Sequence, residues 1–135
     1  MFTLLALLPP AAPDVSIEAL AEKVQSLFGK NLEFKLELEQ LPFKKDRSLI
    51  LRWQGWTARL FCESGTKVTE HVGEVARVLG RAAPAGLASA SRRIRAVFYD
   101  DPQEDYIEEM VDLMRMLREM PGAIVFDPQK NDIVK

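Results

Sequence analysis

Hydrophobic and polar residues alternate most clearly between Leu32 and Glu39. Leucine or phenylalanine occupies every second position of this segment, and lysine or glutamate occupies the positions between them. Successive side chains of a strand point to opposite faces of a sheet, so the alternation predicts a strand with one buried and one solvated face. The runs Phe2–Leu8 and Ile94–Tyr99 are almost continuously apolar, which predicts two buried strands. For Ile94–Tyr99 the pattern further predicts a central strand that is covered on both faces.

Two more strand-like runs, Ser48–Trp53 and Trp56–Cys62, are separated by only two residues, the second of which is Gly55. A two-residue connection with glycine favours a tight β-hairpin, because glycine adopts positive φ without strain. The residues on either side of such a turn face each other, so Trp53 and Trp56 are expected on the same face of the sheet. Two explanations of this pair stay open: it covers one end of the core, or it is exposed and binds a partner.

Two segments with apolar residues at helical spacing, Ile17–Phe28 and Val68–Leu79, predict amphipathic helices. Asp14 and Ser16 are candidate N-caps for the first helix, and a glycine directly follows each of the two segments. The alanine-rich stretch Ala85–Ser91 predicts a further, short helix.

A last amphipathic helix has a well-marked expected start. Asp101, Pro102 and Glu104 follow the order of an N-cap, a first-turn proline and a capping-box acid, so we expect the helix to begin there. Pro121 and Gly122 end the pattern. The apolar spacing predicts the buried face of this helix, which comprises Ile107, Met110, Val111, Met114 and Leu117.

The remaining segments complete the expected fold. Leu41–Arg47 contains a proline and three basic residues, which predicts a loop, and Ala123–Phe126 predicts a short last strand. The order βαβββααβαβ predicts an α+β fold: a mixed, largely antiparallel sheet of five to six strands covered by three to four helices. With 135 residues, 47% of them hydrophobic, the chain suits a single domain, 1–135. The expected core includes Leu36, Leu51, Val97, Ile107, Met110, Met114, Leu117 and Val125.

The apolar start of the chain raises the question of export. No lysine or arginine occurs before Lys23, whereas a signal peptide carries a basic segment ahead of its apolar stretch. The apolar run is also too short to span a bilayer, so it is interpreted as a strand and no membrane association is expected. A single cysteine, Cys62, allows no disulfide framework, which fits a reducing cytoplasm.

Residues that could carry chemistry are few. The only histidine, His71, has no nucleophile motif near it, and Cys62 is expected to be a small buried strand residue. Asp100, Asp101 and Asp127 each follow a predicted strand and could hold magnesium together. We favour structural roles for two of them, Asp101 as a helix cap and Asp127 in an Asp-Pro turn. The sequence therefore predicts no catalytic residue, no metal site, no cofactor and no enzymatic activity.

The charge distribution is the most uneven feature. The formal net charge of −2, from 18 basic and 20 acidic residues, argues against a nucleic-acid partner. Seven acids and no base lie between Asp100 and Asp112. The helix dipole accounts for acids in a first helical turn, which the expected helix start assigns to Glu104 and Asp105. The acids beyond that turn form either a solvated face or a surface that binds a basic partner. This candidate surface comprises Glu104, Asp105, Glu108, Glu109 and Asp112, most of them expected on outer turns of the helix and outside the core.

The layout of the chain resembles that of small bacterial immunity proteins that accompany polymorphic toxins, including toxins of type VI secretion. The resemblance rests on the apolar first strand, the acid-capped helix, the tryptophan hairpin and the closing stretch RIRAVFYDDPQEDYIEEMVDLMRMLREMPGAIVFDPQKNDIV. It implies a cytoplasmic antidote that blocks the active site of a cognate toxin without catalysis of its own. No site residue is carried over from the resemblance, because no short motif supports it.

These observations favour a protein-binding inhibitor whose partner is a cognate toxin with a basic surface. The candidate binding residues are the acids named above together with Trp53 and Trp56. An alternative is a small-molecule-binding or dimeric regulatory domain of ferredoxin-like layout, in which a ligand lies between helix and sheet. A homodimer is compatible with either function.

Overall fold

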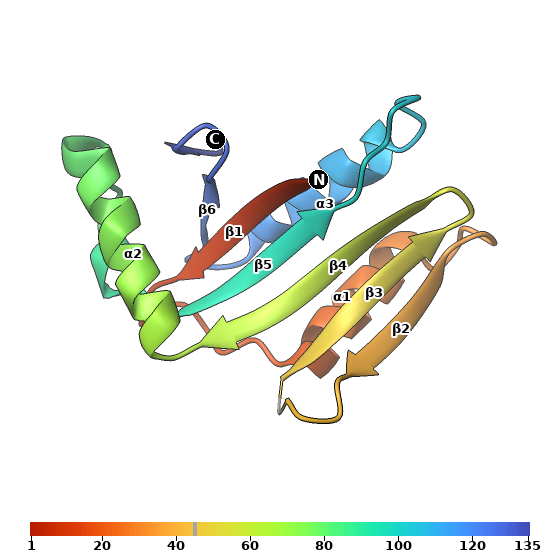
Figure 1. The fold of residues 1–135 in the computed structure, drawn as a ribbon, viewed down its shortest axis with the longest axis horizontal. Coiled ribbons are helices and arrows are strands. Elements are labelled where there is room, and N and C mark those ends of the chain that lie inside the picture. Colours follow the sequence, from red (N-terminus) through yellow and green to blue (C-terminus); the bar gives the residue numbers. More distant parts are fainter. Residues whose placement is uncertain (45) are drawn as a thin grey trace.

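In the part of the chain that the structure describes, seven strands and three α-helices make up the fold (Figure 1). The structure is a computed structural model that describes residues 1–44 and 46–135. The strands are β1 (Phe2–Leu8), β2 (Lys35–Gln40), β3 (Arg47–Trp53), β4 (Trp56–Ser64), β5 (Arg92–Phe98), β6 (Ile124–Asp127) and β7 (Asp132–Ile133). The helices are α1 (Ile17–Phe28), α2 (Thr66–Leu79) and α3 (Ile107–Glu119). The predicted α+β class is confirmed.

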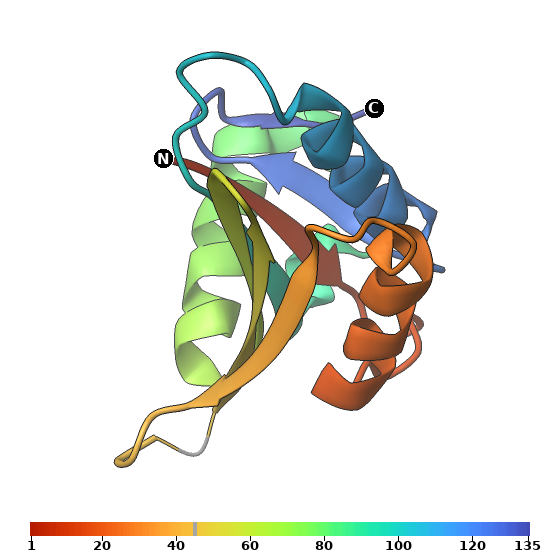
Figure 2. The same cartoon turned by 90° about the vertical axis from the view of Figure 1, so that its right-hand side faces the viewer.

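All strands belong to one sheet, in the order β2-β3-β4-β5-β1-β6-β7. Every pairing is antiparallel, and the two-residue strand β7, which the sequence pattern did not predict, brings the number of strands to seven. α1 and α3 cover one face of the sheet, and α2 lies against the opposite face near one end (Figure 2). None of the helices among the described residues is long and apolar enough to cross a membrane.

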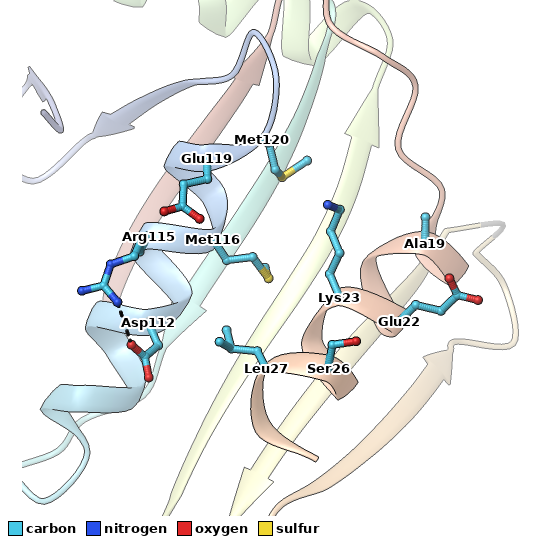
Figure 3. A pocket seen from close by; sticks show the side chains of 10 residues that line it. All are labelled: Ala19, Glu22, Lys23, Ser26, Leu27, Asp112, Arg115, Met116, Glu119 and Met120. Atoms are coloured by element: carbon cyan, nitrogen blue, oxygen red, sulfur yellow. Dashed lines mark hydrogen bonds and ion pairs between the residues drawn. The ribbon is translucent and has the colours of Figure 1, made fainter. Parts of the chain in front are cut away.

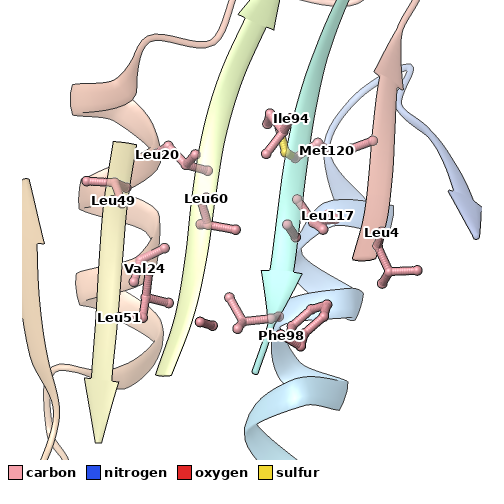
Figure 4. Packing of buried hydrophobic residues seen from close by; sticks show 14 of the residues in the cluster. Leu4, Leu20, Val24, Leu49, Leu51, Leu60, Ile94, Phe98, Leu117 and Met120 are labelled. Carbon is pink, nitrogen blue, oxygen red and sulfur yellow. The ribbon is translucent and has the colours of Figure 1, made fainter. Parts of the chain in front are cut away.

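β1 is apolar throughout because both of its faces are buried. Leu4, Ala6 and Leu8 point into the core beneath α1 and α3, which Figure 4 shows in part. Leu5 and Leu7 point to the other side, into a smaller core beneath α2. The continuous apolar run therefore reflects two separate cores that meet at one strand, and the predicted buried strand is confirmed.

β5 is the central strand of the sheet, as predicted, but only one of its faces is fully covered. Ile94, Ala96 and Phe98 are buried, whereas Arg95 and Val97 on the other face are only half-buried. The expectation of two covered faces is wrong here because α2 reaches only one end of that side of the sheet (Figure 1).

The apolar face of β2, which the alternation predicts to be buried, is only partly buried. β2 is an edge strand, and none of the described strands pairs with its outer side. Leu38 is 55% exposed although it lies on the same face as the half-buried Leu36. Leu32 lies before the strand and is fully exposed. Phe34, just before β2, is buried against the aromatic side chains of Phe28 and Trp53.

α3 begins at Ile107, several residues after the predicted start. The Asp101 carboxylate does accept backbone N–H groups, those of Asp105 and Tyr106, at 3.1 and 2.8 Å. However, the backbone of Glu104 has a φ of 59°, in the left-handed region, which a continuing right-handed helix cannot accommodate. The predicted capping box is therefore wrong: Asp101 stabilises a loop that leads into the helix.

Three other expectations need correction. The alanine-rich stretch forms only a 3₁₀ turn, Leu87–Ser89, in place of the predicted short helix. Of the expected core, Ile107 is instead exposed. The rest is buried (Leu51, Leu117, Val125) or half-buried (Leu36, Val97, Met110, Met114). The predicted loop 41–47 includes Lys45, which lies outside the described residues, and its last residue, Arg47, already belongs to β3.

Candidate functional site

The exposed side of α3 carries apolar residues. Ile107 and Val111 lie one helical turn apart and are 46% and 40% exposed, so their predicted place in the buried stripe is wrong. The buried face of α3 is formed by Leu113 and Leu117, which are fully enclosed against the sheet. The helix is thus rotated relative to the predicted orientation.

The candidate acids occupy three different positions around the start of α3. Glu104 and Asp105 lie in the loop before the helix, Glu108 and Glu109 lie in its first turn, and Asp112 lies one turn further. The helix dipole therefore accounts for Glu108 and Glu109, and not for Glu104 and Asp105 as expected from the sequence.

Most of these carboxylates have no basic neighbour. Asp112 forms an ion pair with Arg115, at 3.3 Å and three residues apart on α3. Among the described residues, no ion pair reaches Glu104, Asp105 or Glu108, and all three are exposed. Two of these uncompensated carboxylates thus precede the exposed Ile107 in the chain, and the third, Glu108, lies between Ile107 and Val111. We call these five residues the α3 surface.

Glu109 differs from the other acids. It is half-buried, and its Oε2 atom is enclosed without a hydrogen-bond partner among the described residues. Asp112 is half-buried as well. Both residues lie outside the core, as expected, but each is partly covered, so substitutions at these two positions would disturb local packing as well as charge.

A groove lies beside the α3 surface, between α1 and α3 (Figure 3). It has a volume of about 750 Å³. Lys23 and Leu27 of α1 project across the groove toward α3, which contributes Met116 and Met120 (Figure 3). Asp112 of α3 also lines the groove. The groove therefore combines an apolar floor with charges of both signs.

Trp53 and Trp56 face each other across the hairpin, as predicted, and both are buried. Their ring centroids are 5.2 Å apart. Trp56 also stacks on Tyr106 at 5.5 Å, and its indole Nε1 donates a hydrogen bond to the carbonyl of Tyr99 at 2.7 Å. The pair therefore covers one end of the core, which is the first of the two explanations that the sequence left open.

The aromatic pair has a second consequence, because it positions the loop that carries Glu104 and Asp105. Tyr106 closes this loop, stacks on Trp56 and accepts a hydrogen bond from the backbone N–H of Gly55 through its hydroxyl, at 3.0 Å. A Cβ atom at position 55 would lie 3.4 Å from that hydroxyl, about the distance of an ordinary van der Waals contact, so the hydrogen bond itself does not require glycine there. The hairpin turn therefore anchors the start of α3.

The other candidate residues have structural surroundings. The Cys62 thiol is half-buried, and burial raises its pKa to about 11, so little reactive thiolate forms at neutral pH. Asp127 accepts hydrogen bonds from the backbone N–H groups of Gln129 and Lys130, which is the turn expected from the sequence. Within residues 1–44 and 46–135, no group of three or more potential ligands gathers into a metal site.

The sequence interpretation missed a charged cluster on the sheet face opposite α1 and α3. Glu63 of β4 accepts hydrogen bonds from Arg93 and Arg95 of β5, at 2.8 and 3.1 Å. Arg95 also lies over the ring of Phe61 at 4.1 Å, and Arg93 contacts His71 Nδ1 at 2.8 Å. The sequence signal for this cluster was the alternation of charged and apolar residues in both β4 and β5.

Glu63 is ionised more readily than an ordinary glutamate. Burial alone would raise the pKa of this carboxyl, but the hydrogen bonds from Arg95 and Arg93 outweigh burial and hold the pKa below its usual value of 4.5. The cluster is internally paired, which indicates a structural role.

Comparison with protein-family models, with curated proteins and with solved structures gives no match to this chain. The functional argument therefore depends on the geometry described above.

Proposed function

We propose that this protein is a non-catalytic inhibitor that binds a basic protein through the α3 surface. The observation that carries the proposal is the exposed apolar pair Ile107 and Val111, accompanied by the uncompensated carboxylates of Glu104, Asp105 and Glu108. The resemblance to immunity proteins supports a cognate bacterial toxin as the partner and a cytoplasmic site of action. Occlusion of the toxin's active site would then neutralise it.

The two kinds of side chain have separate roles in such a complex. Burial of Ile107 and Val111 removes apolar area from water, which stabilises the bound state by roughly 25 cal/mol for each Å². The carboxylates attract a basic partner over a distance of about 8 Å at physiological ionic strength, so they act mainly on the association rate. A toxin that acts on nucleic acid has a basic active site, in which carboxylates can take the place of phosphates.

The groove between α1 and α3 supports a second candidate function, the binding of a small molecule. Its volume of about 750 Å³ lies in the range of ligand sites, and Leu27, Met116 and Met120 provide apolar contacts. The groove lies between two helices, whereas the ferredoxin-like alternative places the ligand between helix and sheet. A ligand of this groove would combine an apolar body with a charged group, to match Lys23 or Glu119.

Binding to the product of the neighbouring gene tests the first proposal. The wild-type protein should form a complex with that product and protect cells that express it. The triple variant E104K, D105K and E108K should lose most of the association rate. A control with the same change in net charge, E33K, E70K and E74K, alters exposed glutamates away from the α3 surface and should bind as the wild type does.

Two results would contradict the proposal. One is equal association rates and equal salt dependence for the triple variant and the wild type. The other is a rise in melting temperature with metabolites but none with the neighbouring gene product, which would favour the small-molecule function.

A further inference from the structure

β2 presents an open edge of the sheet. Among the described residues, it pairs with β3 on one side and with nothing on the other. The opposite edge is β7, which is only two residues long. Proteins usually protect a long edge with a proline, a bulge or an inward-pointing charge. β2 has no proline, bulge or inward-pointing charge: its register with β3 is continuous from Lys35 to Gln40, and its inward-pointing residues are Leu36 and Leu38. Its charged residues, Lys35, Glu37 and Glu39, all lie on the outer face, where they can oppose or assist a partner strand according to register.

The inner side of this edge is apolar and accessible. A shallow groove of about 190 Å³ runs beside Leu36 and Leu38, where α1 does not cover the strand completely. Leu38 is more than half exposed, and Leu32, Leu41 and Phe43 near the two ends of β2 are exposed as well. These four residues are the largest local concentration of exposed apolar side chains in the described part of the sequence.

We propose that β2 pairs antiparallel with β2 of a second copy of this chain, with Glu37 at the two-fold axis. Residues that face each other across an antiparallel pair lie on the same side of the sheet, so only even shifts of register are allowed. With Glu37 on the axis, Lys35 of each copy faces Glu39 of the other, and Leu36 faces Leu38. Opposite charges and apolar pairs thus coincide along the strand.

The competing register with five facing pairs is less favourable. With Leu38 on the axis, Glu37 of each copy faces Glu39 of the other, which places two pairs of like charges directly opposite each other. Leu36 would then face Gln40. The charges of β2 therefore select the register centred on Glu37.

In the selected register, one like-charge pair remains, Glu37 against its own counterpart. Each copy already offsets this charge, because Arg52 of β3 donates a hydrogen bond to the Glu37 carboxylate at 3.0 Å. Arg59 of β4 offsets Glu39 in the same way, at 3.0 Å. The outer face of the joined sheets would therefore alternate acidic and basic side chains across the seam.

The same symmetry extends beyond the strand. If the chains continue antiparallel, Leu41 and Phe43 of one copy pass beside residues 31–33 of the other, which include the exposed Leu32. The α3 surface lies away from β2, behind the other half of the sheet (Figure 1). The dimer therefore goes beyond the proposed inhibitor function and leaves its binding surface free.

Disulfide cross-linking tests the register. In the proposed dimer the two copies of residue 37 face each other at about 5 Å between Cα atoms, which suits a disulfide. Glu37→Cys should therefore cross-link under mild oxidation. Lys35→Cys is the matched control, because the two copies of residue 35 would lie about 13 Å apart along the strands. Cys62 gives both variants the same background, and its half-buried, protonated thiol reacts slowly.

Analytical ultracentrifugation of the uncrosslinked wild type complements this test. We expect a reversible dimer that forms as concentration rises, and a weaker dimer for Lys35→Glu, which puts like charges opposite each other twice. Lys67→Glu on α2 carries the same charge change and should leave the dimer unaffected.

Three results would overturn the proposal. Efficient cross-linking of Leu38→Cys but not of Glu37→Cys would identify the other register. A dimer in which neither cysteine cross-links would place the interface elsewhere. A wild-type protein that stays monomeric at millimolar concentration would show that β2 does not pair with a second copy. The open edge would then be available to a strand of another protein.

Discussion

The orientation of α3 can be tested by comparing alanine substitutions at one leucine and one isoleucine of the same helix. Leu117→Ala and Ile107→Ala remove similar apolar side chains, but Leu117 is fully buried and Ile107 is 46% exposed. The sequence pattern alone places both in the core. The structure therefore predicts a large difference in stability where the sequence pattern predicts none.

The expected magnitudes follow from burial. Truncation of a fully buried leucine costs about 2–5 kcal/mol, since the transfer free energy and the cavity both contribute. Ile107→Ala removes three carbons worth about 0.8 kcal/mol each when buried, and roughly half of that applies here, so we expect about 1 kcal/mol. The better helix propensity of alanine returns a few tenths of a kcal/mol at this position.

Urea unfolding of the two variants and the wild type measures this difference. The unfolding midpoint of Leu117→Ala should fall far more than that of Ile107→Ala, at an unchanged dependence on urea. In thermal unfolding, each kcal/mol should lower the melting temperature of a chain of this size by about 2–6 °C. Equal losses of stability in both variants would refute the orientation of α3 and, with it, the exposed apolar pair on which the proposed function depends.

Three further predictions address the surroundings of the site. The variant E104K, D105K and E108K should keep a free energy of unfolding within about 1 kcal/mol of the wild-type value, because these residues are exposed and unpaired. Its association with a basic partner should become slower and lose its salt dependence. Tyr106→Phe removes the hydrogen bond from Gly55 and should cost about 0.5–1.5 kcal/mol in urea unfolding, with faster proteolysis of the loop before α3. Glu63→Gln should be less stable than the wild type at neutral pH, and the difference should shrink below pH 4.5, because a carboxyl with a lowered folded-state pKa loses its stabilising effect as it is protonated.

The strands could be predicted from the sequence because alternation is a local property of the chain. What the sequence could not show is which faces the helices cover. Phe2–Leu8 and Ile94–Tyr99 have similar apolar runs, yet only the first, β1, is enclosed on both sides, by α1 and α3 on one side and α2 on the other. That difference depends on where α2 packs, and the one local sign of it is the pair Arg93 and Arg95 on the partly open face of β5.

The start of α3 was mispredicted for a similar reason. Asp101 does cap backbone N–H groups, which is what its sequence pattern indicates, but it caps a loop. The helix starts only after Tyr106, whose ring stacks on Trp56 and whose hydroxyl contacts Gly55. These partners lie about fifty residues earlier in the chain, so a local signal for a helix start was overruled by a distant aromatic contact.

The later start of α3 changes which acids need an explanation. With the helix beginning at Ile107, its dipole stabilises Glu108 and Glu109, and an acid is expected at both positions whether or not a partner exists. Glu104 and Asp105 have no such local cause, since they lie in a loop without ion pairs in the described part of the chain. Glu104 even occupies a left-handed conformation that glycine or asparagine adopts more easily than glutamate. Because neither local electrostatics nor backbone conformation favours these two acids, they are the residues of the α3 surface at which a requirement for partner binding should be most evident.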